Sequence, residues 1–353
     1  MRFEKRTEIS PATLILAPIA AVAFTMLVSS LLVLWAGAPV GSTWAALLKG
    51  GFGSVFALTE TLTRATPLIL TGLAVTVAFK ARLFNIGAEG QLYAGALAAV
   101  AVGGLHGGSG FDAPPALLFV LMLAAAALAG ALLLLGPALL KARLGVDEVV
   151  TTLLLNFIVL LGVSALLDGP MKDPAAMGWP QSVGLLPELE LGKLVAGTRV
   201  HTGLLGAVTL AGLLWAFFKY TLPGFEIRAT GANARAAQFA GVPVTRTVVL
   251  VALLSGALAG LAGAVEVAGR TGYVTLDMSP GYGYAGIVIA MLAALHPLAV
   301  VAGAVFVAGV LVGADSMSRA INVPTYIADV IVAASLISVL VATMLTQYKL
   351  KRA

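Results

Sequence analysis

Long apolar runs are the feature that most constrains how this chain can fold. The run from Pro115 to Leu140 contains no charged side chain, and a helix needs about 20 apolar residues to cross a bilayer. Of the 353 residues, 60% are hydrophobic and 10% are charged, whereas soluble domains carry roughly a quarter charged residues. A backbone in lipid must satisfy its own hydrogen bonds. We therefore expect an all-α, polytopic bundle of transmembrane helices.

The apolar pattern predicts about ten spans in a single transmembrane domain, residues 1–353. The first, Pro11–Gly37, exceeds the roughly 7–15 apolar residues of a signal peptide, so we expect it to be retained. Two short segments, Tyr284–Leu295 and Leu298–Gly313, predict either a tight hairpin or a broken, re-entrant pair. The other spans are expected at Arg64–Phe79, Asn85–Leu105, Pro115–Leu140, Val149–Leu167, His201–Phe218, Thr247–Ala268 and Tyr326–Thr346.

The distribution of Lys and Arg predicts the orientation. With ten spans, fourteen of the 21 basic residues fall on the side that carries both tails, and seven fall on the other. Because basic residues favour the cytoplasmic side, we expect both termini and the loop Pro223–Arg246 in the cytoplasm. The long connection Asp168–Val200 would lie outside. The net charge of +5 then reflects membrane topology and does not indicate a nucleic-acid partner.

The cytoplasmic loop Pro223–Arg246 predicts a short helix that docks on another protein. A run of small residues, Ala232–Ala240, lies between Gly231 and Gly241, and glycines commonly mark helix ends. The helix would have a narrow apolar face, which needs a partner surface. The alternative is an ordinary solvated loop. The apolar face comprises Ala236, Phe239 and Ala240, and the polar face comprises Asn233, Arg235 and Gln238.

Polar side chains within the spans are informative because each ionised one costs about 2.5–3.5 kcal/mol at mid-helix. Glu89 and Gln91 lie among glycines that weaken the helix, as in the broken helices of transporters. We expect them to line a pathway or to support it. The alternative is that Glu89 pairs with Arg82 or a neighbouring helix. For Asn156 we expect an interhelical hydrogen bond, with solute contact as the alternative.

Other polar and glycine positions predict helix packing or a role at the outer mouth. Glu266 and Arg270 have the i, i+4 spacing of a helical ion pair. Gly256, Gly260 and Gly263 form a face suited to close helix packing. The tyrosines of the outer connection, Tyr273, Tyr282 and Tyr284, fit an interfacial belt or stacking on a planar ligand. Asp315, Asn322 and Asp329 would be mouth residues or solvated surface.

Several chemistries are excluded. The chain has no Cys, and its His residues are scattered at His106, His201 and His296, so no disulfide and no metal site is expected. The sequence has no G-x-x-x-x-G-K-[ST] loop, so ATP must be bound by another polypeptide. Gly281, Gly283 and Gly286 match G-x-G-x-x-G without a surrounding strand and helix. We find no catalytic arrangement and expect no enzyme.

Three motifs together resemble one family of transport proteins. They are FNIGAEGQLYAGA (Phe84–Ala96), TTLLLNFI (Thr151–Ile158) and ATGANARAAQFAGV (Ala229–Val242). In order and spacing they resemble the membrane permease subunit of bacterial ABC importers in the branched-chain amino acid/ribose-type permease superfamily. Within it the chain is most similar to the purine nucleoside and simple-sugar branch, and riboflavin-type importers are similar as well.

The resemblance implies a multi-pass importer subunit of the bacterial inner membrane that translocates a nucleoside or simple sugar. Its partners would be cytoplasmic ABC ATPase subunits that bind ATP and Mg, a second, paralogous permease, and a periplasmic or lipid-anchored solute-binding protein. No cofactor is expected in this chain. A secondary transporter driven by an ion gradient, with Glu89 as the ion site, is the alternative. The pathway residues that the resemblance implies are Asn85, Gly87, Glu89, Gly90 and Gln91, and the ATPase-coupling residues that it implies are Gly231, Asn233, Ala236, Ala237, Ala240 and Gly241. From the polar pattern we add Asn156 to the pathway and Arg235 to the coupling segment.

Overall fold

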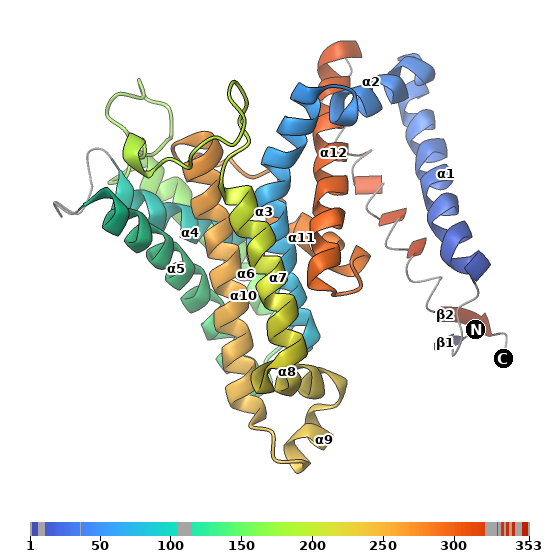
Figure 1. The fold of residues 1–353 in the computed structure, drawn as a ribbon, viewed down its shortest axis with the longest axis vertical. Helices are drawn as coiled ribbons and strands as arrows, with labels where there is room; N and C mark the ends of the chain where they lie inside the picture. The colour runs from blue at the N-terminus through green and yellow to red at the C-terminus, as the bar shows by residue number, and fades with distance from the viewer. Residues whose placement is uncertain are drawn as a thin grey trace. The chain divides into compact units, whose positions relative to one another are not determined.

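The structure is a computed structural model, and nearly all of its regular structure is helical, as predicted (Figure 1). The exception is a short antiparallel pair of strands, β1 (Arg2–Lys5) and β2 (Tyr348–Lys351). The expected span Tyr326–Thr346 falls mostly outside the described residues, as do His106, Asn322 and Asp329. The residues described are 2–5, 11–35, 37–104, 114–321, 330, 333–334, 337–338, 341–342 and 348–351.

The helix boundaries follow from local sequence signals. Asp147 caps the start of α6 by accepting a hydrogen bond from the Val149 N–H at 2.8 Å. Helix α5 ends at Gly145, whose φ of +68° is the left-handed conformation that glycine adopts readily. The helices are α1 (Pro11–Trp35), α2 (Val40–Phe52), α3 (Val55–Lys80), α4 (Ala88–Gly103), α5 (Pro115–Leu144), α6 (Glu148–Asp168), α7 (Gly203–Tyr220), α8 (Leu222–Ala232), α9 (Ala234–Phe239), α10 (Val244–Glu266), α11 (Tyr282–Leu292) and α12 (Pro297–Ile321), with a 3-10 turn at Pro187–Leu189 and a π-helical turn at Val267–Thr271.

The described residues contain six helices that are long and apolar enough to cross a membrane. A seventh is added if the bent pair of α1 and α2, which meet at 118°, counts as one span. Two expected spans are shorter than a bilayer requires: α4 has 16 residues and α11 has 11. The expected total of ten stays a prediction. Helix α2 was not predicted, and Asp315 lies within α12 because this helix continues to Ile321.

The chain divides into two compact units, residues 1–61 with 306–353, and residues 62–305. In the first unit, Val33, Leu47 and Met317 form a buried apolar cluster. A methyl group on Gly51 would overlap the Gly309 carbonyl, so α2 and α12 approach closely there. The prediction of a single permease domain stays a prediction. The candidate site lies entirely in the second unit.

Glycines hold the core of the second unit together. Gly260 of α10 faces Gly95 of α4 on one side and Ala126 of α5 on the other, and a methyl group on Gly260 would overlap the Ala126 carbonyl. Gly256 meets Gly130 in the same way. The predicted glycine face of α10 is therefore confirmed, because these helices approach until their backbones touch.

Several basic residues of the second unit, among them Lys80, Arg82 and Lys141, lie at one end of its helices. Helix α8 runs across the ends of α7 and α10, and α9 follows it (Figure 1). Gly231 of α8 packs against the Lys80 carbonyl at the end of α3. Lys141, at the end of α5, donates to the Arg82 carbonyl at 2.6 Å. One side of the second unit therefore contains the C-terminal ends of α3, α5 and α7 together with α8, as the distribution of Lys and Arg predicts.

Candidate functional site

The site is built around an interruption between α3 and α4. Residues 83–86 are not helical, so their backbone groups need partners from elsewhere. Helix α6 provides them from one face. The Phe84 N–H donates to Glu148 Oε1 at 3.1 Å, and the Ile86 N–H donates to Thr152 Oγ1 at 3.2 Å. These two acceptors are four residues apart, one helical turn.

Asn156 continues the same stripe of α6 one turn further on. Its Oδ1 accepts from the Gly90 N–H at 2.8 Å, and its Nδ2 donates to the Ile86 carbonyl at 2.8 Å. Nδ2 also donates to the Tyr284 hydroxyl of α11 at 3.1 Å. The predicted interhelical hydrogen bonding of Asn156 is confirmed. Its side chain is fully buried, so it joins α6, the interruption and α11.

A second network closes the interruption from the opposite side. Asn85 and Gln91 are both buried, and their side-chain amides exchange two hydrogen bonds of 2.9 Å. Asn85 Oδ1 also accepts from the Gly87 N–H at 2.9 Å. Asn85 Nδ2 donates to Ser255 Oγ of α10 at 3.1 Å, and that hydroxyl donates to the Ala74 carbonyl of α3 at 2.7 Å. Three polar side chains and two backbone groups thereby find partners within the helix bundle.

Glu89 lies in the first turn of α4, and its side chain faces α11. Its Oε2 accepts from the Gly283 N–H at 2.6 Å, and the residue is 3% exposed. The structure therefore pairs Glu89 with a neighbouring helix and not with Arg82. Gly283 fits because a methyl group there would overlap the Glu89 backbone.

The tyrosine cluster differs from its predicted place in an outer connection. Tyr282 and Tyr284 belong to the first turn of α11, and Tyr282 is buried. A position in an interfacial belt is therefore wrong for Tyr282, because packing between helices encloses it. Tyr284 is 37% exposed and Tyr273 is 39% exposed. The structure brings Tyr284 to the candidate site through Asn156.

The loop predicted to dock on a partner contains a short helix, with boundaries that differ from those predicted. Gly231 lies inside α8, and α9 begins at Ala234 because Asn233 caps it, accepting from the Ala236 N–H at 3.1 Å. Ala237 is buried and anchors α9. Phe239 is 97% exposed. The other members of the predicted apolar face, Ala236 and Ala240, are exposed too. Gly241, with a φ of +88°, turns the chain after α9.

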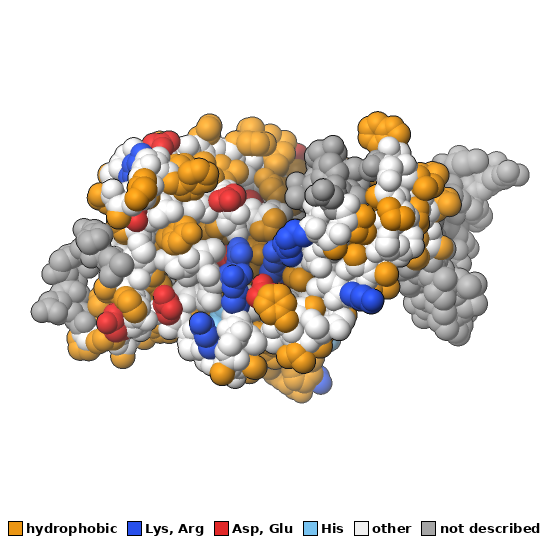
Figure 2. Space-filling view, turned by 90° about the horizontal axis from the view of Figure 1, so that it is seen from above, with side chains coloured by type: hydrophobic (Ala, Val, Ile, Leu, Met, Phe, Trp, Pro, Cys, Tyr) orange, Lys and Arg blue, Asp and Glu red, His pale blue; other side chains and the backbone are white. Residues whose placement is uncertain are grey.

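The opposite end of the second unit is covered by the segment 169–202. The N–H groups of this segment donate to the turn after α10: Leu185 to Gly272 at 2.7 Å and Leu191 to Ala268 at 2.8 Å. The predicted ion pair between Glu266 and Arg270 forms beneath it. The space-filling view onto this end shows acidic and basic side chains among apolar ones (Figure 2).

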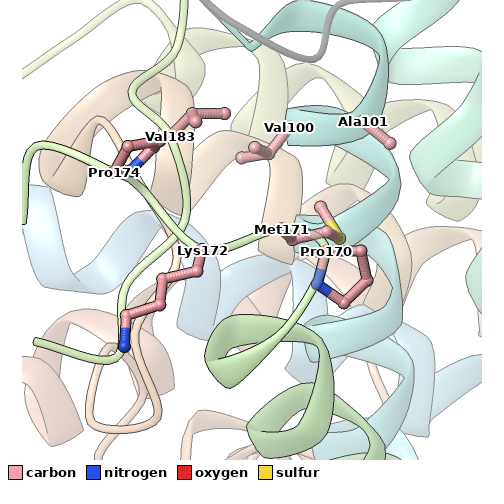
Figure 3. Close-up of a pocket in the computed structure, with 7 residues that line it drawn as sticks. All are labelled: Val100, Ala101, Pro170, Met171, Lys172, Pro174 and Val183. Atoms are coloured by element: carbon pink, nitrogen blue, oxygen red, sulfur yellow. The ribbon is translucent and has the colours of Figure 1, made fainter. Parts of the chain in front are cut away.

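Two cavities are lined by residues of this end that the structure describes. One, of about 270 Å³, is bounded by Val100 and Ala101 of α4 and by the segment after α6 (Figure 3). The other, of about 200 Å³, lies beside the π-helical turn. The first cavity's remaining lining residues are Pro170, Met171, Lys172, Pro174 and Val183, and the second is lined by Glu190, Lys193, Arg199 and residues 267–272.

His201 is a buried histidine at this end, just before α7. It is 1% exposed, and neither ring nitrogen has a hydrogen-bond partner among the residues that the structure describes. The ring packs where a methyl group on Gly269 would overlap it. Burial disfavours the charged imidazolium and lowers the pKa of His201 to about 4. His201 is therefore neutral at physiological pH. It does not form a metal cluster with other described residues.

Sequence reasoning missed three members of the site: Glu148, Thr152 and Ser255. The first two share a signal with Asn156, since polar residues at i, i+4 and i+8 of an apolar helix lie on one face. Ser255 carries no such signal, because a single serine in a helix commonly bonds its own backbone. Glu148 is additionally held by an ion pair with Lys141.

Apolar spans, a non-helical connection held inside the bundle between α3 and α4, and an exposed helix at one end suit a membrane transport subunit. The chain belongs to the family described as the branched-chain amino acid transport system permease component, whose model matches residues 57–340. A member of this family is a transport component and not an enzyme, and this chain is a multi-pass protein of the inner membrane.

Three curated relatives are similar over most of their length. The guanosine ABC transporter permease protein NupP of Bacillus subtilis is 36% identical, covering 90% of this chain and 91% of the relative. The glucose ABC transporter permease protein TsgB13 of Haloferax volcanii is 38% identical, covering 84% and 79%. The nucleoside ABC transporter permease protein NupB of Lactococcus lactis is 30% identical, covering 91% and 89%.

Proposed function

We propose that this chain is a permease subunit of an ABC importer for purine nucleosides. The observation that carries the proposal is its similarity to NupP along 90% of the chain. The chain lacks a P-loop, so the energy comes from ATP hydrolysis on partner subunits. A solute-binding protein outside the cell would deliver the nucleoside, and a second, paralogous permease would complete the pathway.

The coupling segment would receive the movement of the ATPase. Helix α9 presents Ala236, Phe239 and Ala240 to solvent although they are apolar, which suits insertion into a groove on a partner. Arg235 would add a polar contact at the rim. Gly231, Asn233, Ala237 and Gly241 would act differently: they set the position and direction of α9 through the packing, cap and turn described above. This end would face the cytoplasm, with both termini, in a permease of about ten spans.

The translocation pathway would run beside the non-helical connection between α3 and α4. Discontinuous helices place backbone groups at the depth of a solute in other transporters. Asn85, Gln91 and Asn156 would maintain the interruption through their hydrogen bonds, while Gly87 and Gly90 allow close approach: a methyl group on Gly90 would lie 2.9 Å from Asn156 Oδ1. Alternating access would follow from movement of the helices that these networks join.

A simple sugar is the second candidate solute. The relative TsgB13, a glucose permease, is 38% identical over 84% of this chain, slightly more identical than NupP. A polar site that holds the ribose of a nucleoside can also be suited to a hexose. The two solutes therefore have to be separated by measurement.

Uptake by cells with and without this gene tests the proposal. We expect loss of tritiated guanosine uptake on deletion, restoration by the wild-type gene, and competition by unlabelled guanosine but not by glucose or riboflavin. Tagged chain extracted in mild detergent should retain an ATPase subunit. Uptake of labelled glucose in place of guanosine would shift the assignment to the sugar. Guanosine uptake that persists without ATP, in the presence of an ion gradient, would overturn the ABC mechanism.

A further inference from the structure

Two short helices meet head to head inside the second unit. Helix α4 has 16 residues and α11 has 11, fewer than the roughly 20 that a span requires. The first turns of a helix leave backbone N–H groups without partners within the helix, and they carry a partial positive charge. Both helix starts are buried here. The backbone N–H groups in these first turns therefore need a hydrogen-bond acceptor.

Glu89 supplies that acceptor across the junction. Although it belongs to the first turn of α4, its Oε2 accepts from the Gly283 N–H in the first turn of α11 at 2.6 Å. A carboxylate placed there interacts favourably with both helix starts. The side chain is 3% exposed. Little of its surface is left for a solute.

Other hydrogen bonds join the segment before α11 to α4. Tyr93, one turn after Glu89 on α4, donates to the Leu276 carbonyl at 2.6 Å and accepts from the Ser279 N–H at 3.4 Å. The absent side chain of Gly283 lets the two backbones touch. The start of α11 is thus attached to α4 at successive points.

We propose that Glu89 is a positioning residue whose carboxylate oxygen joins α11 to α4, so that the two short helices move as one body during transport. This inference rests on the proposed import function and gives Glu89 a role other than solute contact. The required property is an acceptor at the right distance. Glutamine keeps an acceptor oxygen at that distance, whereas aspartate keeps the charge but is shorter by one methylene.

Uptake of tritiated guanosine by cells that express each variant separates the roles. We expect Glu89→Gln to keep at least about a third of the maximal rate, and Glu89→Asp and Glu89→Ala to lose about tenfold or more, with KM within about twofold of wild type. Membrane levels of the tagged chain are measured for every variant. The reverse order, with aspartate active and glutamine inactive, would show that the charge itself is required. A tenfold rise in KM at an unchanged maximal rate would show solute contact. Either result overturns the proposal.

A measurement without solute tests the junction independently. Thermal unfolding of the purified full chain in detergent is compared for Glu89→Ala, Gly283→Ala and the double variant. Because both changes break one junction, their combined loss should be smaller than the sum. Glu89→Ala combined with Gly212→Ala is the matched control, since nothing lies within 4 Å of a methyl group on Gly212, and this pair should be additive. If the stability losses of Glu89→Ala and Gly283→Ala added up in the double variant, the proposed junction would be wrong. Absence of guanosine uptake by the wild type would instead overturn only the proposed solute.

Discussion

Asn85 and Gln91 exchange two side-chain hydrogen bonds of 2.9 Å across the start of α4. Asn85 precedes the helix and Gln91 lies in its first turn, so the pair closes a loop of the chain around Gly87. Both side chains are buried, and a buried amide that loses its partner keeps the cost of its desolvation. The non-helical connection before α4 is therefore specified by side chains.

Substitutions of this pair should be strongly non-additive. Asn85→Leu and Gln91→Leu should each destabilise the chain by about 1–3 kcal/mol, because each leaves a buried amide without its partner. The double variant should lose less than the sum, since both partners are then absent. Thermal unfolding in detergent measures all three. If the stability loss of the double variant equalled the sum of the two single losses, each amide would have another, stronger partner.

Asn156→Leu should destabilise the chain and abolish transport. It leaves the Gly90 N–H and the Ile86 carbonyl without the partner seen here, at a cost of about 1–3 kcal/mol for each orphaned group. Thr151→Val is the matched control on the same helix, because Thr151 bonds only to carbonyls of its own turn. Unfolding midpoints and guanosine uptake should change for Asn156→Leu alone. A similar loss in both variants would point to a general effect on α6.

Gly260→Ala should loosen the packing of α10. The added methyl group would overlap the Ala126 carbonyl, and backbone atoms cannot move aside as a flexible side chain can. We expect a loss of about 1–3 kcal/mol, in the range of overpacked cores. Gly212→Ala in α7 meets no neighbour and should be neutral or stabilising by up to about 1 kcal/mol. Detergent unfolding of both variants checks this, and a stable Gly260→Ala would contradict the close approach.

Ala236→Glu should uncouple the chain from its ATPase while leaving it in the membrane. The position is exposed on α9 beside Phe239, so a charge there would be buried in the proposed groove without a partner. We expect the tagged variant to recover at least tenfold less ATPase on pull-down. Ala196→Glu, an exposed position in the segment that covers the opposite end, is the control. Normal recovery and uptake with Ala236→Glu would remove α9 from the interface.

His201 should make the folded state sensitive to acid. Its pKa is about 4 in the folded chain and about 6.5 when unfolded, so the unfolded state binds the extra proton first. Stability from the neutral ring is complete above pH 6.5 and is lost as the pH falls to about 4, by at most about 1.4 kcal/mol per unit. Unfolding midpoints between pH 7 and pH 5 should fall less steeply for His201→Phe than for the wild type. Equal slopes in the wild type and in His201→Phe would exclude His201 as the source.

Much of the site could be found from the sequence because polar residues in an apolar span are costly and therefore stand out. Glu89, Gln91 and Asn156 were identified in this way, as was the i, i+4 pair of Glu266 and Arg270. Their partners were less accessible. Gly283 and Ser255 reach the site from segments 194 and 170 residues away from Glu89 and Asn85, respectively, and nothing local to either residue indicates the contact.

By itself the sequence determined that this chain is a helical membrane protein, because its apolar runs and sparse charges leave no other stable fold in a bilayer. It also determined the family, through three motifs, and the small-residue faces where helices can approach. Only the tertiary structure decided where α4 begins, since the extended residues before it are stabilised by α6 and α10. Likewise, only the structure placed the start of α11 against Glu89. Such contacts join segments distant in the chain, and hydrophobic pattern encodes burial without specifying which buried groups meet.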